Sequence, residues 1–584
     1  MIRINQIKLS IFRVGRDRDK EYELVKASAA RLLKLKPDAL RKLKIVRRSI
    51  DARDKNDILF VYTVDLKLKD SVAGPGQENE TAFVKALRNN NITISFESPV
   101  VIPRADLTGS TGGTDSSENA VSAENSECTR NIDSKESSGA HGLRPVIIGC
   151  GPCGLFAALA FAEAGLKPLI IERGSNVDER TKEVERFHES GRLDTDSNVQ
   201  FGEGGAGTFS DGKLNTSIKG RQSYIHYVLK TFVRFGADED ILVDQKPHIG
   251  TDALKGIIKN IREYVISCGG EFRFNTRLDD IIIENGRVKA ISLSSLRGQR
   301  GQELMPADTV ILAAGHSARD TFEMLKSRGV RLEQKSFAMG VRVSHPQAMI
   351  DEALYGADRL SEKQEILGPA SYKLTHRLKD GRSIYSFCMC PGGYIINSSS
   401  EPGMLAVNGM SMHDRDSATA NSALIVNVNA DDFGSDDVLA GMYLQRDIEK
   451  KAYSLTDGCI PYETFAEFKA REASPVGDTA FPVSFKGIAV PADVRSILPD
   501  FMASAIEEGM PAFARQIKGF DSDDTVIAGI ESRTSSPVRI VRDERFESNI
   551  RGLYPAGEGA GYAGGITSAA ADGVRLAVCL LGEE

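Results

Sequence analysis

The sequence predicts an α/β protein: a Rossmann-like parallel-sheet domain, interrupted by a mixed α+β second domain and preceded by an α+β domain of ferredoxin-like order. Two observations predict the parallel sheet. A strand, a glycine-rich loop, a helix and a second strand follow one another within residues 145–172, and buried-type strands keep alternating with helices after them. A third observation, the length of 584 residues, predicts several domains. The expected units are 1–103 (ferredoxin-like), 104–143 (flexible linker), 144–331 and 522–584 (the two parts of the Rossmann-like domain) and 332–521 (the inserted domain).

The first 103 residues alternate between short β-like runs and amphipathic runs. Their order is β-α-β-β-α-β, which one open sheet with two helices on a face satisfies. The expected strands are 2–11, 45–50, 58–66 and 92–96, and the expected helices are 21–33 and 82–88. This unit carries 21 Lys and Arg against 13 Asp and Glu, while the whole chain has a net charge of −7. A basic unit on an acidic body permits an anionic partner, although a solvated basic surface is the commoner reason for such a balance.

Residues 104–143 contain twelve Ser and Thr and no aromatic residue. Because too little apolar surface is present to offset the entropy of ordering, we expect a flexible linker there. The chain starts with no secretory signal, and its eight cysteines have no disulfide-like spacing. The longest apolar stretch, 155–162, is too short to span a bilayer. These features predict a soluble cytoplasmic protein with no membrane partner.

The strand at 145–148 leads directly into a G-x-G-x-x-G loop, Gly149 to Gly154, followed by a helical run at 155–164 and a strand at 169–172. In this context the first glycine allows the turn, the second lets backbone N–H groups approach a pyrophosphate, and the third lets the helix pack on the strand. Glu172 ends the second strand, where a carboxylate can accept hydrogen bonds from a ribose. The unit therefore predicts binding of an adenine dinucleotide.

Three further segments favour FAD over NAD. The strand at 309–315 ends in small residues, the glycine-rich stretch at 552–566 opens a helical run at 567–581, and residues 202–212 contain five glycines. The last segment formally contains a second G-x-G-x-x-G. We reject it as a nucleotide site because the polar residues before it form no buried strand and Ser210-Asp211-Gly212 would break a following helix. We interpret it as a loop that covers the cofactor.

Several of these segments carry a resemblance to known proteins. Residues 171–174, 311–316 and 555–566 resemble the glutathione-reductase-like flavoproteins with two dinucleotide folds. More specifically, residues 201–214, 387–393, 408–411 and 531–537 resemble a family of bacterial and plastid FAD-dependent proteins that are often labelled NAD(FAD)-utilising dehydrogenases and have no assigned reaction. The resemblance implies bound FAD, a FAD domain interrupted by a second domain, and an unknown substrate.

The resemblance also implies where FAD lies. The glycines of the first loop and Glu172 would hold the ADP half, Arg277 or Leu278 would lie near the adenine, and the segment 557–566 would hold the ribityl and flavin half. The residues expected at the cofactor are Gly149, Gly151, Pro152, Cys153, Gly154, Glu172, Arg173, Gly204, Gly205, Ala206, Ser210, Lys213, Arg277, Leu278, Ala313, Ala314, Gly315, Gly557, Glu558, Gly565 and Ile566. NADH or NADPH is considered as a transient electron donor.

Candidates for the chemistry lie in or near these loops: Asp211, Lys213, His316, Cys388, Cys390 and Arg533. Lys213 and Arg533 suit a carboxylate, a phosphate or the developing anion of a flavin. Cys388 and Cys390 form a C-x-C in a strand-like run, which predicts thiols on opposite faces. Residues 173–267 lack the cysteine pair of a disulfide reductase, and no cysteine set has the spacing of a metal site.

The function expected from the sequence is an FAD-dependent oxidoreductase that transfers hydride between flavin N5 and an unidentified small organic substrate. Two alternatives stay open. One is a flavoprotein acting on RNA, suggested by the basic first unit, although we do not favour nucleic acid as a partner. The other is a non-catalytic flavin-binding scaffold that senses redox state. The sequence does not predict the oligomeric state.

Overall fold

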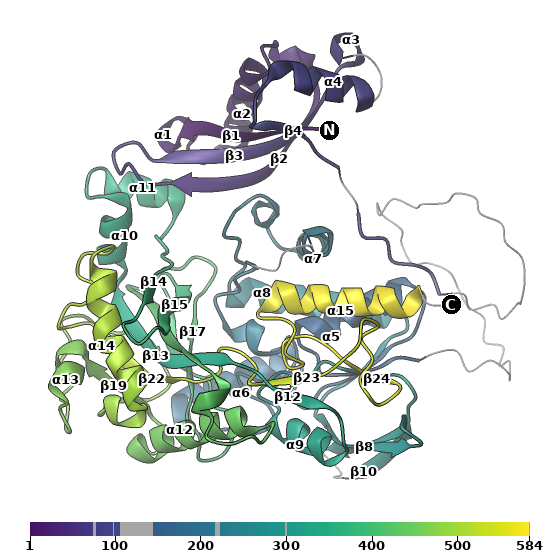
Figure 1. Cartoon of the computed structure of the whole chain (residues 1–584), viewed down its shortest axis with the longest axis vertical. Coiled ribbons are helices and arrows are strands. Elements are labelled where there is room, and N and C mark those ends of the chain that lie inside the picture. The colour runs from purple at the N-terminus through teal and green to yellow at the C-terminus, as the bar shows by residue number, and fades with distance from the viewer. Residues whose placement is uncertain (74–76, 97–98, 106–143, 216–221, 298–300, 583–584) are drawn as a thin grey trace, which may run out of the picture.

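The computed structural model describes residues 1–73, 77–96, 99–105, 144–215, 222–297 and 301–582. The linker expected at 104–143 lies outside these residues except for its first two. The described chain has mixed α/β structure with one entirely parallel sheet (Figure 1). Across the described residues, no helix is both long and apolar enough to cross a membrane.

The amino-terminal unit contains the strands and helices that the sequence predicts, which are β1 (Ile2–Ser10), α2 (Arg18–Leu32), β2 (Leu40–Asp51), β3 (Leu59–Leu68), α4 (Gln77–Leu87) and β4 (Ile92–Ile94). The short helices α1 (Ile11–Val14) and α3 (Asp70–Ala73) were not predicted. The strands form an antiparallel sheet in the order β2-β3-β1-β4. Asp17 begins α2 by accepting hydrogen bonds from the N–H groups of Asp19 and Lys20.

Two basic residues attach this unit to the rest of the chain. Arg48 on β2 donates to Asp244 at 2.8 Å and also pairs with Glu21 at 3.2 Å. Lys363, which is buried on α11 (Leu360–Leu367), donates to the carbonyl of Lys55 at 2.8 Å. Arg48, which belongs to the first unit, therefore uses its charge in contacts within the chain.

The parallel sheet has the strand order β24-β11-β5-β6-β7. Its strands are β5 (Val146–Ile148), β6 (Leu169–Ile171), β7 (Glu271–Arg273), β11 (Val310–Leu312) and β24 (Leu553–Pro555). On one face, Ile147 packs with α5 (Pro152–Glu163), α15 (Ile566–Leu581), α7 (Gln222–Arg234) and α8 (Thr251–Ser267), and Figure 1 shows α15 lying beside α5. On the other face, Val146 and Ile148 pack with an antiparallel sheet of β8 (Thr276–Glu284), β9 (Arg287–Ser295) and β10 (Gln302–Pro306). The alternation of side chains along each strand thus buries both faces.

The largest sheet has seven strands in the order β14-β15-β18-β13-β22-β19-β21. These strands are β13 (Phe337–Pro346), β14 (Thr375–Arg377), β15 (Ser383–Cys390), β18 (Thr419–Val428), β19 (Ile460–Thr464), β21 (Ala489–Pro491) and β22 (Val526–Glu531). β22 comes from the range 522–584 that the sequence groups with the parallel sheet, yet it pairs with β13 and β19. The strand β22 therefore belongs to the seven-stranded sheet, and the chain returns to the parallel sheet only at β24.

The remaining elements cover or connect these sheets. A small sheet has the order β17-β16-β20, and β12 pairs with β23. These elements are β12 (Leu332–Gln334), β16 (Tyr394–Asn397), β17 (Val407–Met410), β20 (Phe485–Lys486), β23 (Val538–Ile540), α6 (Val177–Ser190), α9 (Arg319–Ser327), α10 (Gln347–Tyr355), α12 (Ala440–Thr456), α13 (Phe465–Ala470) and α14 (Asp500–Ala514). Figure 1 places α13 and α14 on the outer flank of the seven-stranded sheet, far from α15.

Candidate functional site

The glycine turn after β5 is built by backbone contacts. Gly149 has a φ of +100°, and a Cβ at this position would lie 2.7 Å from the carbonyl oxygen of Ala313 at the end of β11. Helix α5 begins at Pro152, three residues earlier than the sequence predicts, and its N-cap Gly151 has no side-chain cap. The turn therefore requires glycine, and it leaves the positive end of a helix without a capping side chain.

Glu172 links this turn to two neighbouring backbone segments by hydrogen bonds. Its carboxylate accepts hydrogen bonds from the N–H of Cys150 at 2.7 Å and from the N–H groups of Gly174 and Gly202 at 2.9 Å each. The sequence predicts a ribose contact for this residue. In the structure the buried Glu172 carboxylate also joins the backbone at Cys150, Gly174 and Gly202 through these three hydrogen bonds.

The glycine-rich loop at 201–214 lies directly against the turn. A Cβ on Gly205 would lie 3.0 Å from Gly151 Cα, so the two backbones are nearly in contact. Residues 206–209 form one short 3-10 turn and the preceding residues form no strand, which confirms the rejection of a second nucleotide fold. The fully buried Arg180 on α6 shapes the loop by donating to the carbonyls of Asn198, Val199, Glu203 and Gly205.

The amino end of α15 forms the opposite side of the site. Gly564 and Gly565 are exposed, and a Cβ on either one would meet no atom within 4 Å. The same is true of Gly315 after β11. The N–H of Gly565 donates to Glu558 Oε2 at 3.3 Å, and His316 Nε2 lies 3.9 Å from Glu558 Oε1. Open backbone, a helix amino end and two titratable side chains therefore meet here.

Burial changes the proton affinity of both titratable groups. Burial raises the pKa of Glu558 to about 7. Burial, together with the positive charges of Arg533 and Arg319, lowers the pKa of His316 to about 3, so its imidazole is neutral at physiological pH. His316 Nδ1 is buried and has no hydrogen-bond partner among the described residues.

Asp211 and Lys213 lie where the glycine-rich loop meets the seven-stranded sheet. The fully buried Asp211 accepts from Arg415 Nη2 at 2.6 Å and from the Ser411 hydroxyl, and Lys213 Nζ lies 3.5 Å from it. Burial acts to raise the pKa of Asp211, but Lys213 and Arg415 outweigh it and lower that pKa. Lys213 Nζ is buried and donates no hydrogen bond within the described part of the chain. A charged donor is thus left available for a ligand.

Cys388 and Cys390 lie on β15 next to this group. The prediction that their thiols point to opposite faces is wrong, because β15 bulges against β18 between Phe387 and Cys390, and Cys388 has a left-handed φ of +43°. The Cys390 thiol instead donates to the carbonyl oxygen of Cys388 at 3.3 Å. The neighbouring Cys390 thiol, Lys213 and Arg342 together lower the pKa of Cys388 against the effect of burial.

Arg342, fully buried on β13, holds the bulge in place. It donates to the carbonyl of Cys388 at 2.7 Å, lies 3.8 Å from Cys390 Sγ, and pairs with Glu531 at 2.9 Å. Burial raises the pKa of Glu531 to about 7 although Arg342 acts to lower it. Arg342 and Glu531 were not predicted from the sequence, because charged residues buried inside strands carry no periodic signal.

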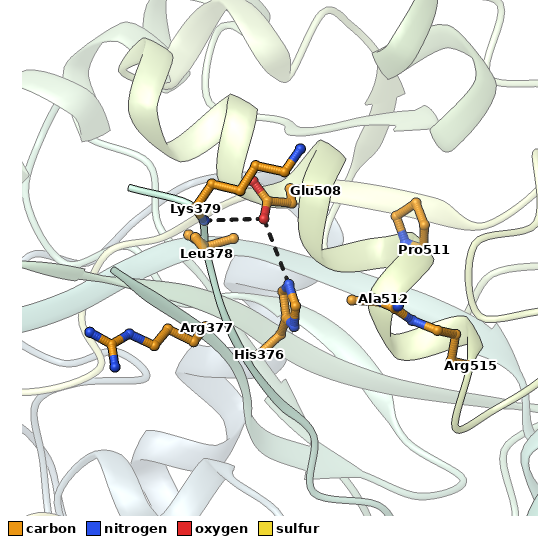
Figure 2. Close-up of a pocket in the computed structure, with 8 residues that line it drawn as sticks. All are labelled: His376, Arg377, Leu378, Lys379, Glu508, Pro511, Ala512 and Arg515. Carbon is orange, nitrogen blue, oxygen red and sulfur yellow. Dashed lines mark hydrogen bonds and ion pairs between the residues drawn. The ribbon is translucent and has the colours of Figure 1, made fainter. Parts of the chain in front are cut away.

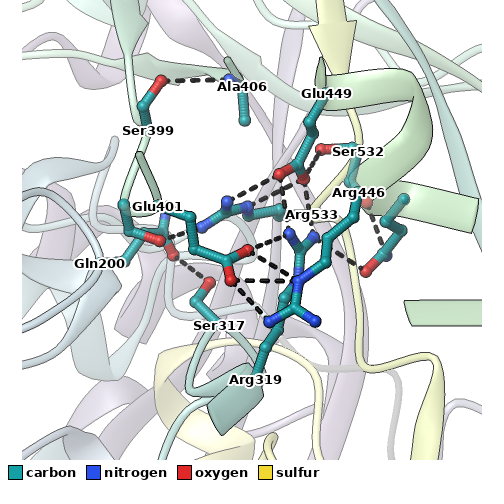
Figure 3. Close-up of polar contacts among 12 residues, drawn as sticks. Gln200, Ser317, Arg319, Ser399, Glu401, Ala406, Arg446, Glu449, Ser532 and Arg533 are labelled. Carbon is teal, nitrogen blue, oxygen red and sulfur yellow. Dashed lines mark hydrogen bonds and ion pairs between the residues drawn. The ribbon is translucent and has the colours of Figure 1, made fainter. Parts of the chain in front are cut away.

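Arg533 belongs to a buried ion network (Figure 3), and its positive charge also acts on His316. It donates to both carboxylate oxygens of Glu449 at 2.8 and 3.0 Å and to the Ser400 hydroxyl. Arg319 binds the same carboxylate at 2.8 Å and Glu401 at 2.5 Å. Removing one partner of such a buried pair typically costs about 3–5 kcal/mol. The network therefore fixes α9, α12 and the end of β22 around the site, and it occupies the guanidinium of Arg533.

The other residues expected at the cofactor are spread around the turn. Arg173 pairs with Asp320 at 2.8 Å and lies over the Phe201 ring, and Arg277 pairs with Asp279 at 2.8 Å. Leu278 is buried in the core below the parallel sheet. Pro152, Gly204 and Ile566 line a small apolar cavity of about 10 Å³. Cys153, Gly154 and Ala313 pack in the core beside them, whereas Ala206 and Ser210 belong to the glycine-rich loop.

The residues present fit FAD in two respects. The turn supplies backbone donors and a helix amino end for phosphates, and the opposite side supplies open glycines at 315, 564 and 565. Lys213 and His316 each add a buried nitrogen that has no hydrogen-bond partner among the described residues. We find no group of three or more His, Cys, Asp and Glu arranged for a metal within the described ranges.

A larger cavity of about 640 Å³ lies elsewhere, between β14 and α14 (Figure 2). Figure 2 shows His376 and Lys379 beside Glu508, which lies 3.7 Å from His376 and accepts from the Lys379 N–H at 3.2 Å. None of the sequence-predicted residues lines this cavity. It is separate from the site described above.

Comparison with known proteins gives the following similarities. Residues 336–534 match a family described as FAD-dependent protein, C-terminal domain-like, and residues 1–67 match a domain of unknown function. An uncharacterized protein of Clostridium beijerinckii is 39% identical over 582 residues, which cover 99% of this chain and 98% of that protein.

Among solved structures, the glycerol-3-phosphate dehydrogenase of Bacillus halodurans, complexed with FAD, is 12% identical with a TM-score of 0.33. The match covers 74% of this chain and 63% of the dehydrogenase, so the chain spans less than two thirds of the length of that protein. The glycine oxidase of Bacillus cereus is 12% identical with a TM-score of 0.30, and the match covers 76% of this chain and 96% of the oxidase.

Proposed function

The chain belongs to the same family as the Clostridium beijerinckii protein, and from this membership and the site geometry we propose that it is an FAD-dependent oxidoreductase. In this proposal hydride passes between flavin N5 and a small organic substrate. The substrate binds between the amino end of α15 and the bulge of β15. FAD would supply the redox chemistry, and the chain supplies orientation, charge and proton handling.

One observation carries the proposal. Two buried nitrogens, Lys213 Nζ and His316 Nδ1, have no hydrogen-bond partner among the described residues, and both lie in segments that the sequence assigns to the cofactor. Buried polar groups are nearly always satisfied in folded proteins, so each of these two nitrogens supports a bound ligand as its missing partner. The open glycines at the start of α15 lie next to Glu558 in the same region.

The charges suit a reaction in which negative charge develops. Lys213 and the amino end of α15 would stabilise an anion on the ligand. Glu558, with a pKa of about 7, exchanges a proton near physiological pH, as a general acid or base requires. His316 stays neutral and offers a hydrogen bond without charge.

Anaerobic rapid mixing with NADH or NADPH, followed by oxygen, tests the proposal on the full chain loaded with FAD. The expected result is loss and recovery of the flavin absorbance band on a catalytic timescale with one of the two donors. A screen of small metabolites against the same band would then identify the substrate. A bound flavin that is neither reduced nor reoxidised would favour the non-catalytic scaffold instead.

The RNA alternative makes a separate prediction. If the basic first unit bound RNA, the chain would retain tRNA at low salt and release it as salt increases. The pairing of Arg48 with Glu21 and Asp244 leaves this guanidinium engaged within the protein. We therefore propose a small-molecule substrate and no nucleic-acid partner.

A further inference from the structure

The two thiols of β15 are close neighbours with unequal surroundings. Cys390 is fully buried, and its S–H also reaches the carbonyl of Cys388 at 3.3 Å. Cys388 is only partly buried, so a small solute can reach it more easily. The bulge of β15 turns the Cys390 side chain back toward Cys388, whereas a regular strand would direct the two side chains to opposite faces.

The charges around the pair favour a thiolate on Cys388. Lys213 and Arg342 act on it with positive charge, and the negative groups facing it are Asp211, Glu531 and Glu558. Lys213 Nζ has no hydrogen-bond partner in the described residues, so its charge is only partly neutralised by Asp211 at 3.5 Å. The neighbouring Cys390 thiol acts in the same direction as these positive charges. Thiolates near cations are the reactive form of cysteine.

We propose that Cys388 and Cys390 form a peroxide-reactive thiol pair in which Cys388 is the attacking thiolate and Cys390 the resolving thiol. This inference rests on the proposed function only in placing the pair beside the flavin site. Cysteines that sense oxidants are typically accessible thiolates next to a resolving cysteine, which is the arrangement found here.

The reaction has two balanced steps. The Cys388 thiolate attacks one oxygen of a hydroperoxide, the O–O bond breaks, and hydroxide or alkoxide leaves with the electron pair. Cys388 is thereby oxidised to a sulfenic acid and the peroxide is reduced. The Cys390 sulfur then attacks Cys388 Sγ, an S–S bond forms, and the sulfenic oxygen leaves as water with the proton of Cys390.

The disulfide would change the electrostatics of the flavin site. A negative thiolate next to Glu531 and Glu558 would be replaced by a neutral bond. Because Cys388 raises the pKa of both carboxyl groups, oxidation would lower these pKa values. Peroxide would in this way adjust the protonation of the site in which we place the general acid or base.

Peptide mapping of the purified full chain after treatment with hydrogen peroxide tests the proposal. We expect the peptide that contains both cysteines to lose the mass of two hydrogen atoms and to regain it with dithiothreitol. In Cys390→Ser, Cys388 should instead accumulate as a sulfenic acid that dimedone traps. Cys459 is a control thiol of comparable burial whose pKa is raised by burial and by Asp457, and it should react at least roughly tenfold more slowly.

A second variant tests the specificity of the reaction. In Cys150→Ser/Cys153→Ser the disulfide at β15 should form as in the wild type. The proposal is overturned if wild-type Cys388 reacts no faster than Cys459, if no internal disulfide forms, or if dimedone labels wild type and Cys390→Ser equally. These measurements need no flavin chemistry, so a chain that binds no FAD could still show the disulfide, and the two proposals fail separately.

Discussion

The molecule contains two pairs of cysteines close in sequence, and their surroundings differ sharply. Cys150 and Cys153 lie in the glycine turn, where burial and nearby carboxylates raise the pKa of both thiols well above the ordinary value. Cys388 and Cys390 lie in the bulge of β15, where the neighbouring Cys390 thiol and two cations lower the pKa of Cys388. Cysteine spacing alone therefore does not identify the reactive pair.

The difference follows from the role of each segment. The contacts of the glycine turn are made by its backbone, through the N–H of Cys150 and the left-handed Gly149. Its thiols only fill space. The properties of the bulge depend on side chains, because the positive charges of Arg342 and Lys213 act on the Cys388 thiol. The turn should be sensitive to added volume, and the bulge to changes in chemistry.

The largest effect is expected from Gly149→Ala in the turn. A left-handed backbone costs a residue with a Cβ about 1–3 kcal/mol, and the new methyl group would also press on Ala313 O. We expect FAD to bind at least roughly tenfold more weakly, measured as the flavin-to-protein absorbance ratio after gel filtration. Cys150→Ser, in the same turn, should keep its flavin. Equal retention by both variants would contradict the role given to the backbone.

The next largest effect should appear in alkylation rates. At pH 7 iodoacetamide should modify Cys388 on the order of a hundredfold faster than Cys150, because only Cys388 has a stabilised thiolate. Mass spectrometry of quenched samples measures both sites in one protein. Similar rates at the two positions would remove the distinction between the two pairs.

Lys213→Met should reduce, but not abolish, the difference in alkylation rate between Cys388 and Cys150. Losing this positive charge raises the pKa of Cys388, so the midpoint of the alkylation rate against pH should move up by about one unit. Lys42→Met, an exposed charge on β2 of the amino-terminal unit, is the matched control and should leave the midpoint unchanged. An unshifted midpoint in Lys213→Met would show that the bulge does not depend on this charge.

The smallest effect concerns Glu558→Gln. The folded pKa of Glu558 is about 7, above its ordinary value of 4.5, so its contribution to stability is complete below about pH 4.5 and is lost as the pH rises through about 7. Glutamine cannot ionise. The thermal midpoint of the variant minus that of the wild type should therefore increase between pH 5 and pH 8. The increase should be only about 1–2 °C, because solvent screens the partly exposed carboxyl group. A difference that is constant with pH would argue against the raised pKa.

Sequence reasoning located the elements whose contacts are local. The strands around the glycine turn, the amino-terminal β-α-β-β-α-β order and the helix at the carboxyl end follow from periodicity and glycine placement, and the structure confirms them. Boundaries shifted slightly, as at α5, where Pro152 takes the first helical position that proline favours.

Long-range pairings were not predictable in the same way. Nothing in Val526–Glu531 indicates that this strand joins the seven-stranded sheet beside β13. The bulge at Cys388 depends on register with β18, and Arg342 is a charge buried in a strand, where apolar residues are expected. The site is assembled from segments about 200 residues apart, as in the contact of Arg415 with Asp211. One-dimensional patterns do not encode such contacts.

The central claim is that the glycine turn and the open end of α15 together hold FAD beside the thiols of β15. The most direct test is the visible spectrum of the purified full chain after incubation with FAD and removal of the unbound cofactor. We predict close to one flavin per chain, with a flavin spectrum that changes when peroxide oxidises Cys388 and Cys390. A protein that remains colourless and gains no flavin absorbance would contradict the claim.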